Sequence, residues 1–136
     1  MLRLLITYLA VGIAFAAVDY VWLTQIGPGV YFPTLDPVAL RAARIEPAIV
    51  FYLVYIAGVV ALAVWPTREG PLLRTTLTGA LLGAMCYATY DLTNQATLKV
   101  WATKITVLDI GWGTFLTAVG ATVGGLVLRR MSPRTA

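Results

Sequence analysis

Three aspartates lie inside strongly apolar stretches of this chain, where a carboxyl group needs a physical explanation. Asp19, Asp91 and Asp109 come from three separate apolar segments. An aspartate that faces lipid costs a few kcal/mol, so each carboxyl group is expected to point into the protein. Because clustered carboxylates repel one another, at least one of the three should hold a proton or lie beside a bound cation.

Tryptophan follows two of these aspartates at the same spacing. Trp22 follows Asp19, and Trp112 follows Asp109, in the same pattern Asp-x-x-Trp. This spacing places the ring and the carboxyl group on nearby faces of a helix. An aromatic wall beside carboxylates suits a cationic, partly apolar ligand, although tryptophan and tyrosine also anchor helices at membrane interfaces. The predicted ligand-binding residues are Asp19, Trp22, Tyr87, Asp91, Asn94, Asp109 and Trp112.

The apolar composition indicates which elements position these residues. Hydrophobic residues make up 60% of the 136 residues and charged residues only 12%. The usual charged share of soluble domains is about a quarter, so lipid is the expected solvent. Four apolar stretches have roughly the 20 residues that a membrane-spanning helix needs. The prediction is a single all-α domain over residues 1–136, an integral membrane four-helix bundle with helices at about 4–26, 47–65, 72–95 and 105–128.

The segment between the first two helices carries two further expectations. Gly27-Pro28-Gly29 is expected to end the first helix. Asp36-Pro37 resembles a helix cap followed by a first-turn proline. Because Val38, Ala42 and Ile45 then recur on one side, a short interfacial helix is predicted here. An irregular loop is the alternative.

Helical spacing predicts that the carboxyl groups meet in one layer. In a hairpin array of four helices, all three aspartates lie about four to seven residues from one membrane surface, a depth of about 6–10 Å at 1.5 Å per residue. Each shares a helix face with small or polar residues, and small residues mark close helix contacts in membranes. The three faces are Tyr8, Gly12, Ala16 and Asp19; Gly79, Gly83, Tyr87, Asp91 and Asn94; and Asp109, Gly113, Thr117, Gly120 and Gly124.

Basic residues predict the orientation in the membrane. More Lys and Arg residues lie on the side of the two termini and the second loop than on the side of the first and third loops. The positive-inside tendency therefore places both termini in the cytoplasm. Arg3 before an apolar run, together with Ala14-Phe15-Ala16, also resembles a secretion signal with its peptidase site. An uncleaved first helix is expected instead.

The residue types that are missing exclude several classes of site. The chain has no histidine and one cysteine, Cys86, so disulfides, zinc sites, haem held by histidine and nucleophiles activated by histidine are excluded. No metal site is predicted, and the sequence identifies no cofactor. The basic residues flank apolar segments and form no single stripe, so nucleic acid is not an expected partner. Lys99 and Lys104 belong to the polar end, so a structural salt-bridge network without a ligand is an alternative.

Five short motifs resemble a known family. They are Asp19-Tyr20-Val21-Trp22, Phe51-Tyr52-Leu53-Val54-Tyr55, Tyr90-Asp91-Leu92-Thr93-Asn94, Ala96-Thr97-Leu98 and Asp109-Ile110-Gly111-Trp112-Gly113. With them the chain resembles, over nearly its whole length, a bacterial family of small predicted membrane proteins catalogued as domain of unknown function 2177. The resemblance implies four membrane helices, a bacterial inner (plasma) membrane location and no established activity. Members are often associated with genes for lipid modification, so the resemblance also implies, loosely, a role around acyl chains.

These observations support hypotheses of different classes. The leading hypothesis is a binding or transport protein whose carboxylate cluster accepts a proton, a metal cation or a small cationic solute, with protonation coupled to binding. Four helices are few for a transporter, so a homodimer is expected. The alternative is a lipid-modifying membrane enzyme, or a membrane subunit of one, with Asp19 or Asp91 as general acid or base. A third hypothesis is a purely structural assembly partner.

Overall fold

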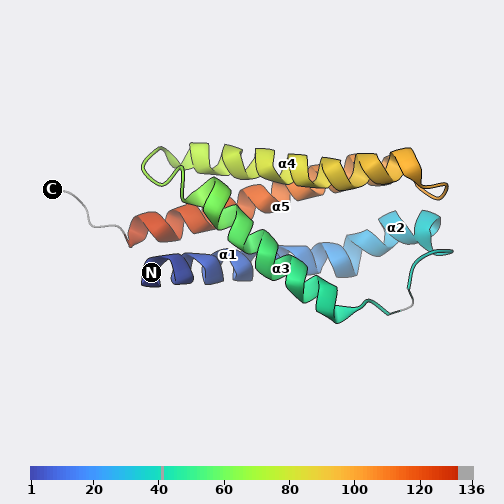
Figure 1. Ribbon diagram of the computed structural model, residues 1–136, viewed down its shortest axis with the longest axis horizontal. Helices are drawn as coiled ribbons and strands as arrows, with labels where there is room; N and C mark the ends of the chain where they lie inside the picture. Colours follow the sequence, from blue (N-terminus) through green and yellow to red (C-terminus); the bar gives the residue numbers. More distant parts are fainter. Residues whose placement is uncertain (41, 132–136) are drawn as a thin grey trace.

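The described part of the chain folds into helices without any strand. The structure is a computed structural model that describes residues 1–40 and 42–131. Two π-helical segments continue α-helices without a break, so four long helical segments result (Figure 1). In chain order the elements are α1 (Leu2–Val21), η1 (Trp22–Ile26), α2 (Gly27–Leu35), α3 (Ile45–Val59), η2 (Val60–Val64), α4 (Leu72–Thr97) and α5 (Thr103–Arg130).

The first helical segment does not stop at Gly27-Pro28-Gly29, so that prediction is wrong. The backbone N–H of Gly27 donates to the carbonyl oxygen of Trp22, five residues back. This wider turn carries the helix across Pro28, which has no N–H to donate and otherwise disrupts an α-helical ladder. The helix therefore continues through α2 to Leu35, about two turns beyond the predicted end.

The predicted interfacial helix is not found among the described residues of the first loop. Residues 36–40 form turns and a bend, residue 42 forms another bend, and Arg44 leads in extended form to α3. Val38 is 65% exposed and Leu40 is 57% exposed. Since short helices depend on packing an apolar face for their stability, this segment has too little buried surface to hold a helix.

Among the described residues, three helical segments are long and apolar enough to cross a membrane. They are Leu2–Leu35, Ile45–Val64 and Thr103–Arg130. The helix α4 is equally long but more polar, because it carries Arg74, Asp91, Asn94 and several threonines. The all-helical fold is thus confirmed for the described residues, with three candidate membrane spans, and the crossing of the bilayer by α4 stays a prediction.

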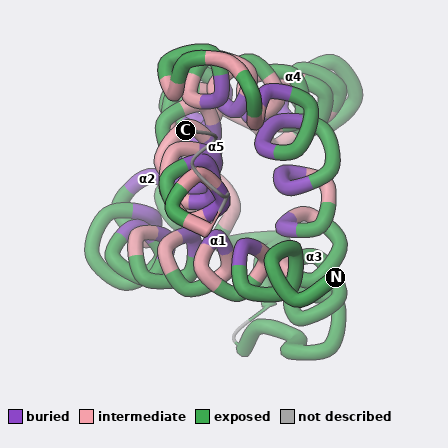
Figure 2. The backbone as a smooth tube through the Cα atoms, turned by 90° about the vertical axis from the view of Figure 1, so that its left-hand side faces the viewer, coloured by how far each residue is buried: buried purple, intermediate pink, exposed green. Residues whose placement is uncertain are grey.

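The helix α5 forms the centre of the packing. Figure 2 shows α5 between α1 and α4, with buried residues where these helices meet. The predicted face of α5, from Asp109 through Gly113 to Gly124, is fully buried, as expected. On α1 the buried face is instead Thr7, Val11, Phe15 and Asp19, so the predicted face is wrong by one residue over most of its length.

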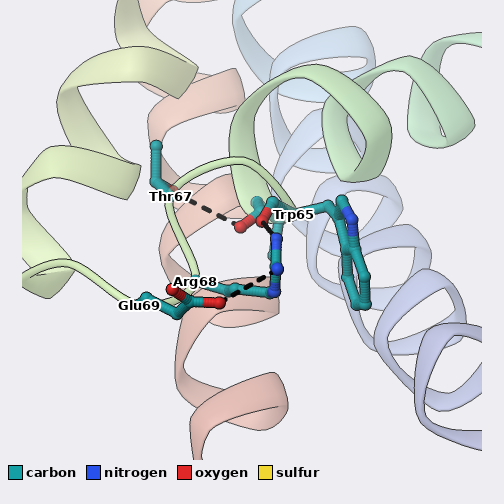
Figure 3. A network of polar contacts seen from close by, with 5 residues as sticks. Trp65, Thr67, Arg68 and Glu69 are labelled. Carbon is teal, nitrogen blue, oxygen red and sulfur yellow. Dashed lines mark hydrogen bonds and ion pairs between the residues drawn. The ribbon is translucent and has the colours of Figure 1, made fainter.

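A turn joins η2 to α4 and is fixed by polar contacts. The guanidinium group of Arg68 lies 4.2 Å from the Trp65 ring centre, donates to the Trp65 carbonyl oxygen at 2.8 Å and pairs with Glu69 at 3.0 Å (Figure 3). From α5, Arg129 Nη2 donates to the carbonyl oxygens of Thr67 and Gly70 at 3.1 and 2.9 Å. The end of α5 and the start of α4 are therefore tied to the same turn.

Candidate functional site

A cavity of about 670 Å³ lies among the helices at the end of the molecule where α2 and the α4–α5 loop meet. Every long helical segment contributes to its wall. Most of the lining side chains are aromatic, and two are carboxylates. The lining residues are Asp19, Trp22, Leu23, Tyr31, Leu35, Ala48, Phe51, Tyr52, Tyr55, Cys86, Tyr87, Tyr90, Trp101, Asp109 and Trp112.

The carboxyl group of Asp19 is held by two donors from other helices. The side chain is only 7% exposed. Its Oδ2 atom accepts a hydrogen bond from the hydroxyl group of Tyr52 on α3. Its Oδ1 atom accepts one from Nε1 of Trp112 on α5, at 3.1 Å. Since both donors are neutral, they orient the carboxyl group without neutralising its charge.

The carboxyl group of Asp109 is held by one neutral donor. Its Oδ1 atom accepts a hydrogen bond of 2.5 Å from the hydroxyl group of Tyr31. That hydroxyl oxygen accepts in turn from Nε1 of Trp22, at 3.0 Å. Tyr31 reaches this position because the first helical segment continues past Gly27, so the π-helical turn is part of what builds the site.

The two tryptophans of the repeated Asp-x-x-Trp pattern stack on each other. The ring centres of Trp22 and Trp112 lie 4.5 Å apart with an angle of 11° between the planes. The spacing predicts that each ring accompanies the aspartate of its own helix. The structure instead pairs Trp112 of α5 with Asp19 of α1. The pattern thus joins the two helices across the cavity wall.

Two of the predicted site residues do not line the cavity. Asp91 is fully buried, and neither of its carboxylate oxygens has a hydrogen-bond partner. It lies within electrostatic range of Asp109. Asn94 is half-buried one turn further along α4. The remaining predicted residues, Asp19, Trp22, Tyr87, Asp109 and Trp112, all line the cavity.

The carboxyl groups have no cationic partner within the described residues. Lys99 and Lys104 are exposed and make no ion pair there, so the alternative of a structural salt-bridge network is not formed. The ion pair between Arg68 and Glu69 lies outside the cavity, in the turn that joins η2 to α4 (Figure 3). Within residues 1–40 and 42–131, no group of three His, Cys, Asp or Glu side chains is arranged to hold a metal ion.

Sequence reasoning missed the tyrosines that hold the carboxyl groups. Tyr52 and Tyr55 lie three residues apart and therefore share a face of α3, which is a signal that the sequence did contain. Tyr55 donates to or accepts from Thr117 at 2.8 Å. Tyr31 could not be found in this way, because the segment that contains it is predicted as a loop.

The loop between α4 and α5 is held over one side of the cavity. Nε1 of Trp101 donates to Oγ1 of Thr106 at 2.9 Å, and that hydroxyl group donates to Oε1 of Gln95 at 2.7 Å. The Trp101 ring contacts the edge of Tyr90 with 5.9 Å between ring centres. Gln95 therefore fixes a cavity-lining tryptophan from outside the cavity.

Comparison with known proteins identifies a family and nothing more specific. The family model described as "Predicted membrane protein (DUF2177)" matches residues 4–126. This confirms the resemblance seen in the sequence motifs. No curated protein and no solved structure matches the chain.

Proposed function

Since the chain belongs to the family of predicted membrane proteins described as domain of unknown function 2177, we propose its function from the cavity: it binds a small organic cation that has an apolar part. One observation carries the proposal. Asp19 and Asp109 line an aromatic cavity, and only neutral donors hold their carboxyl groups. A cation is the group that this arrangement still lacks.

The electrostatics of the cavity favour a positive charge. At an effective dielectric constant of about 20, two unit charges 4 Å apart interact by about 4 kcal/mol. Each aromatic ring whose face meets the cation adds about 0.5–2 kcal/mol. The nine aromatic residues of the wall offer such faces and also cover the apolar part of the ligand. The cavity volume of about 670 Å³ is that of a small-molecule site.

Asp91 is proposed as the group that binds a proton. An ionised carboxylate with no hydrogen-bond donor is costly in a buried position, and both oxygens of Asp91 lack a donor. The titratable groups near it are Asp109, Tyr31 and Tyr90. In the Asp91→Asn variant, cation binding should therefore depend less on pH than in the wild type. Identical pH profiles of the two proteins would contradict this role.

We also propose that α4 crosses the bilayer with the other helices. It packs closely along α5, where a Cβ atom on Gly83 would lie 2.2 Å from the carbonyl oxygen of Gly113. Because α4 packs so closely along α5, the two helices should lie at the same depth in the bilayer. The four-helix transmembrane domain, the bacterial inner membrane location and the cytoplasmic termini belong to this proposal. Reporter fusions at the C-terminus and in the α4–α5 loop measure that orientation.

The binding experiment uses a cation and its neutral isostere. Wild-type protein in nanodiscs is titrated with benzyltrimethylammonium and, separately, with neopentylbenzene, which has the same shape without the charge. The wild type should prefer the cation. Asp19→Asn and Asp109→Asn should each weaken cation binding at least ten-fold, which corresponds to about 1.4 kcal/mol. Glu46→Gln, an exposed carboxylate outside the cavity, is the matched control.

Equal binding of the two compounds by the wild type, or binding of neither, would refute the proposal. Because this comparison uses the wild type, it does not depend on the folding of the aspartate variants. Transport of the cation and the expected homodimer stay predictions. Uptake into proteoliposomes measures transport, and light scattering of the purified protein measures the oligomeric state.

A further inference from the structure

Four of the five exposed residues of the cavity wall lie on α3 and α4, which places its opening between these helices; the fifth is Leu23 on η1. The helix α3 crosses the others obliquely, and its N-terminal end lies far from α4 (Figure 1). At its other end, η2 packs against α4 and α5, and Val59, Val60, Ala63 and Val64 belong to the core there. From residue 45 to residue 55 the helix is exposed except for Tyr52 and Tyr55, which are half-buried.

Exposed side chains line both edges of this opening. On α3 they are Ala48 and Phe51, and Phe51 is 42% exposed. On α4 they are Cys86, which is exposed, and Tyr90, which is 59% exposed. Cys86 lies near the middle of α4, about 16 Å along the helix axis from Thr97. If α4 spans the bilayer as proposed, the opening faces hydrocarbon rather than water.

Polarity changes from the inner wall of the cavity to this opening. Asp19 and Asp109 are each only 7% exposed and lie among buried and half-buried rings. The edges of the opening carry a methyl group, two aromatic rings and a thiol. A ligand that extends through the cavity therefore meets carboxylates at one end and apolar surface at the other.

We propose that the ligand is an amphiphile with an amine or quaternary ammonium head group and at least one alkyl chain. The head group lies between Asp19 and Asp109, and the chain leaves between α3 and α4 into the bilayer. This inference rests on the proposed function, since it names the class of cation bound. The alkyl chain of the ligand stays in contact with the bilayer during binding, so the ligand enters sideways from the membrane without passing through water.

Photo-crosslinking tests where the chain lies. The probe is dodecyltrimethylammonium with a diazirine in the middle of its chain, added to the protein in nanodiscs at a fixed ratio to lipid. Adducts mapped by mass spectrometry should concentrate on Ala48, Phe51, Cys86 and Tyr90. Excess benzyltrimethylammonium should remove most of these adducts, because it competes for the carboxylates. Adducts on other lipid-facing residues should persist.

A pair of variants on α3 controls for general exposure to lipid. Ala48→Phe adds a ring at the edge of the opening and should lower the competed adducts at least five-fold. Ala57→Phe adds the same ring at an exposed position that does not line the cavity, and it should leave them unchanged. Equal yields of the competed adducts in Ala48→Phe and Ala57→Phe would refute the opening between α3 and α4.

The outcomes separate this inference from the function on which it rests. If benzyltrimethylammonium binds but removes no adducts along α3 and α4, the cation site stands and the amphiphile is refuted. If neither compound shows carboxylate-dependent binding, the proposed function itself fails.

Discussion

Adding one methyl group to Gly113 should separate the two most tightly packed helices. A Cβ atom at this position would lie 2.1 Å from Cγ of Tyr87 and 2.2 and 2.5 Å from its two Cδ atoms. Ordinary contact between carbon atoms begins at about 3.5 Å, so the ring or the helix must move by roughly 1.4 Å. Gly113→Ala should therefore lower the free energy of unfolding by about 1–3 kcal/mol, as overpacked cores do.

The same helix supplies a matched control. Gly111 is also in α5, and a Cβ atom there would meet nothing within 4 Å. Gly111→Ala should be neutral or stabilising by up to about 1 kcal/mol, because alanine favours helix more than glycine does. Both variants can be compared by SDS titration, followed by circular dichroism. Equal stability of the two variants would refute the close packing of α4 on α5.

Two further predictions concern single hydrogen-bonding side chains. Tyr31→Phe should lower the free energy of unfolding by about 1–3 kcal/mol, because Asp109 loses its donor; Tyr20→Phe, at a tyrosine 68% exposed, should have little effect in the same SDS titration. Arg129→Gln should destabilise by about 2–3 kcal/mol, since the charged group that bonds the α4 turn is lost. Arg130→Gln, at an exposed position, is its control, and equal midpoints of the two arginine variants would contradict the contacts described.

The candidate site was partly accessible from the sequence. Aspartates in apolar segments are costly wherever they face lipid, so their inward orientation could be predicted without knowledge of the fold. All three are buried, and two of them line one cavity. The tyrosine partners depend on which helices lie opposite one another, and spacing within one helix holds no information about that. Tyr52 and Trp112 meet at Asp19 only because α3 and α5 flank α1 there.

Local properties of the chain were enough to predict the second, third and fourth long helices, the apolar environment and the buried face of α5, because hydrophobic runs and small-residue spacing can be read along the sequence. How the first helix passes Pro28 became clear only from the folded protein, since a π-helical turn replaces the expected helix end there. The folded structure also shows that α3 crosses the other helices obliquely, with its N-terminal end far from α4 (Figure 1). Both features depend on contacts between distant segments, which compete with local preference and here outweigh it.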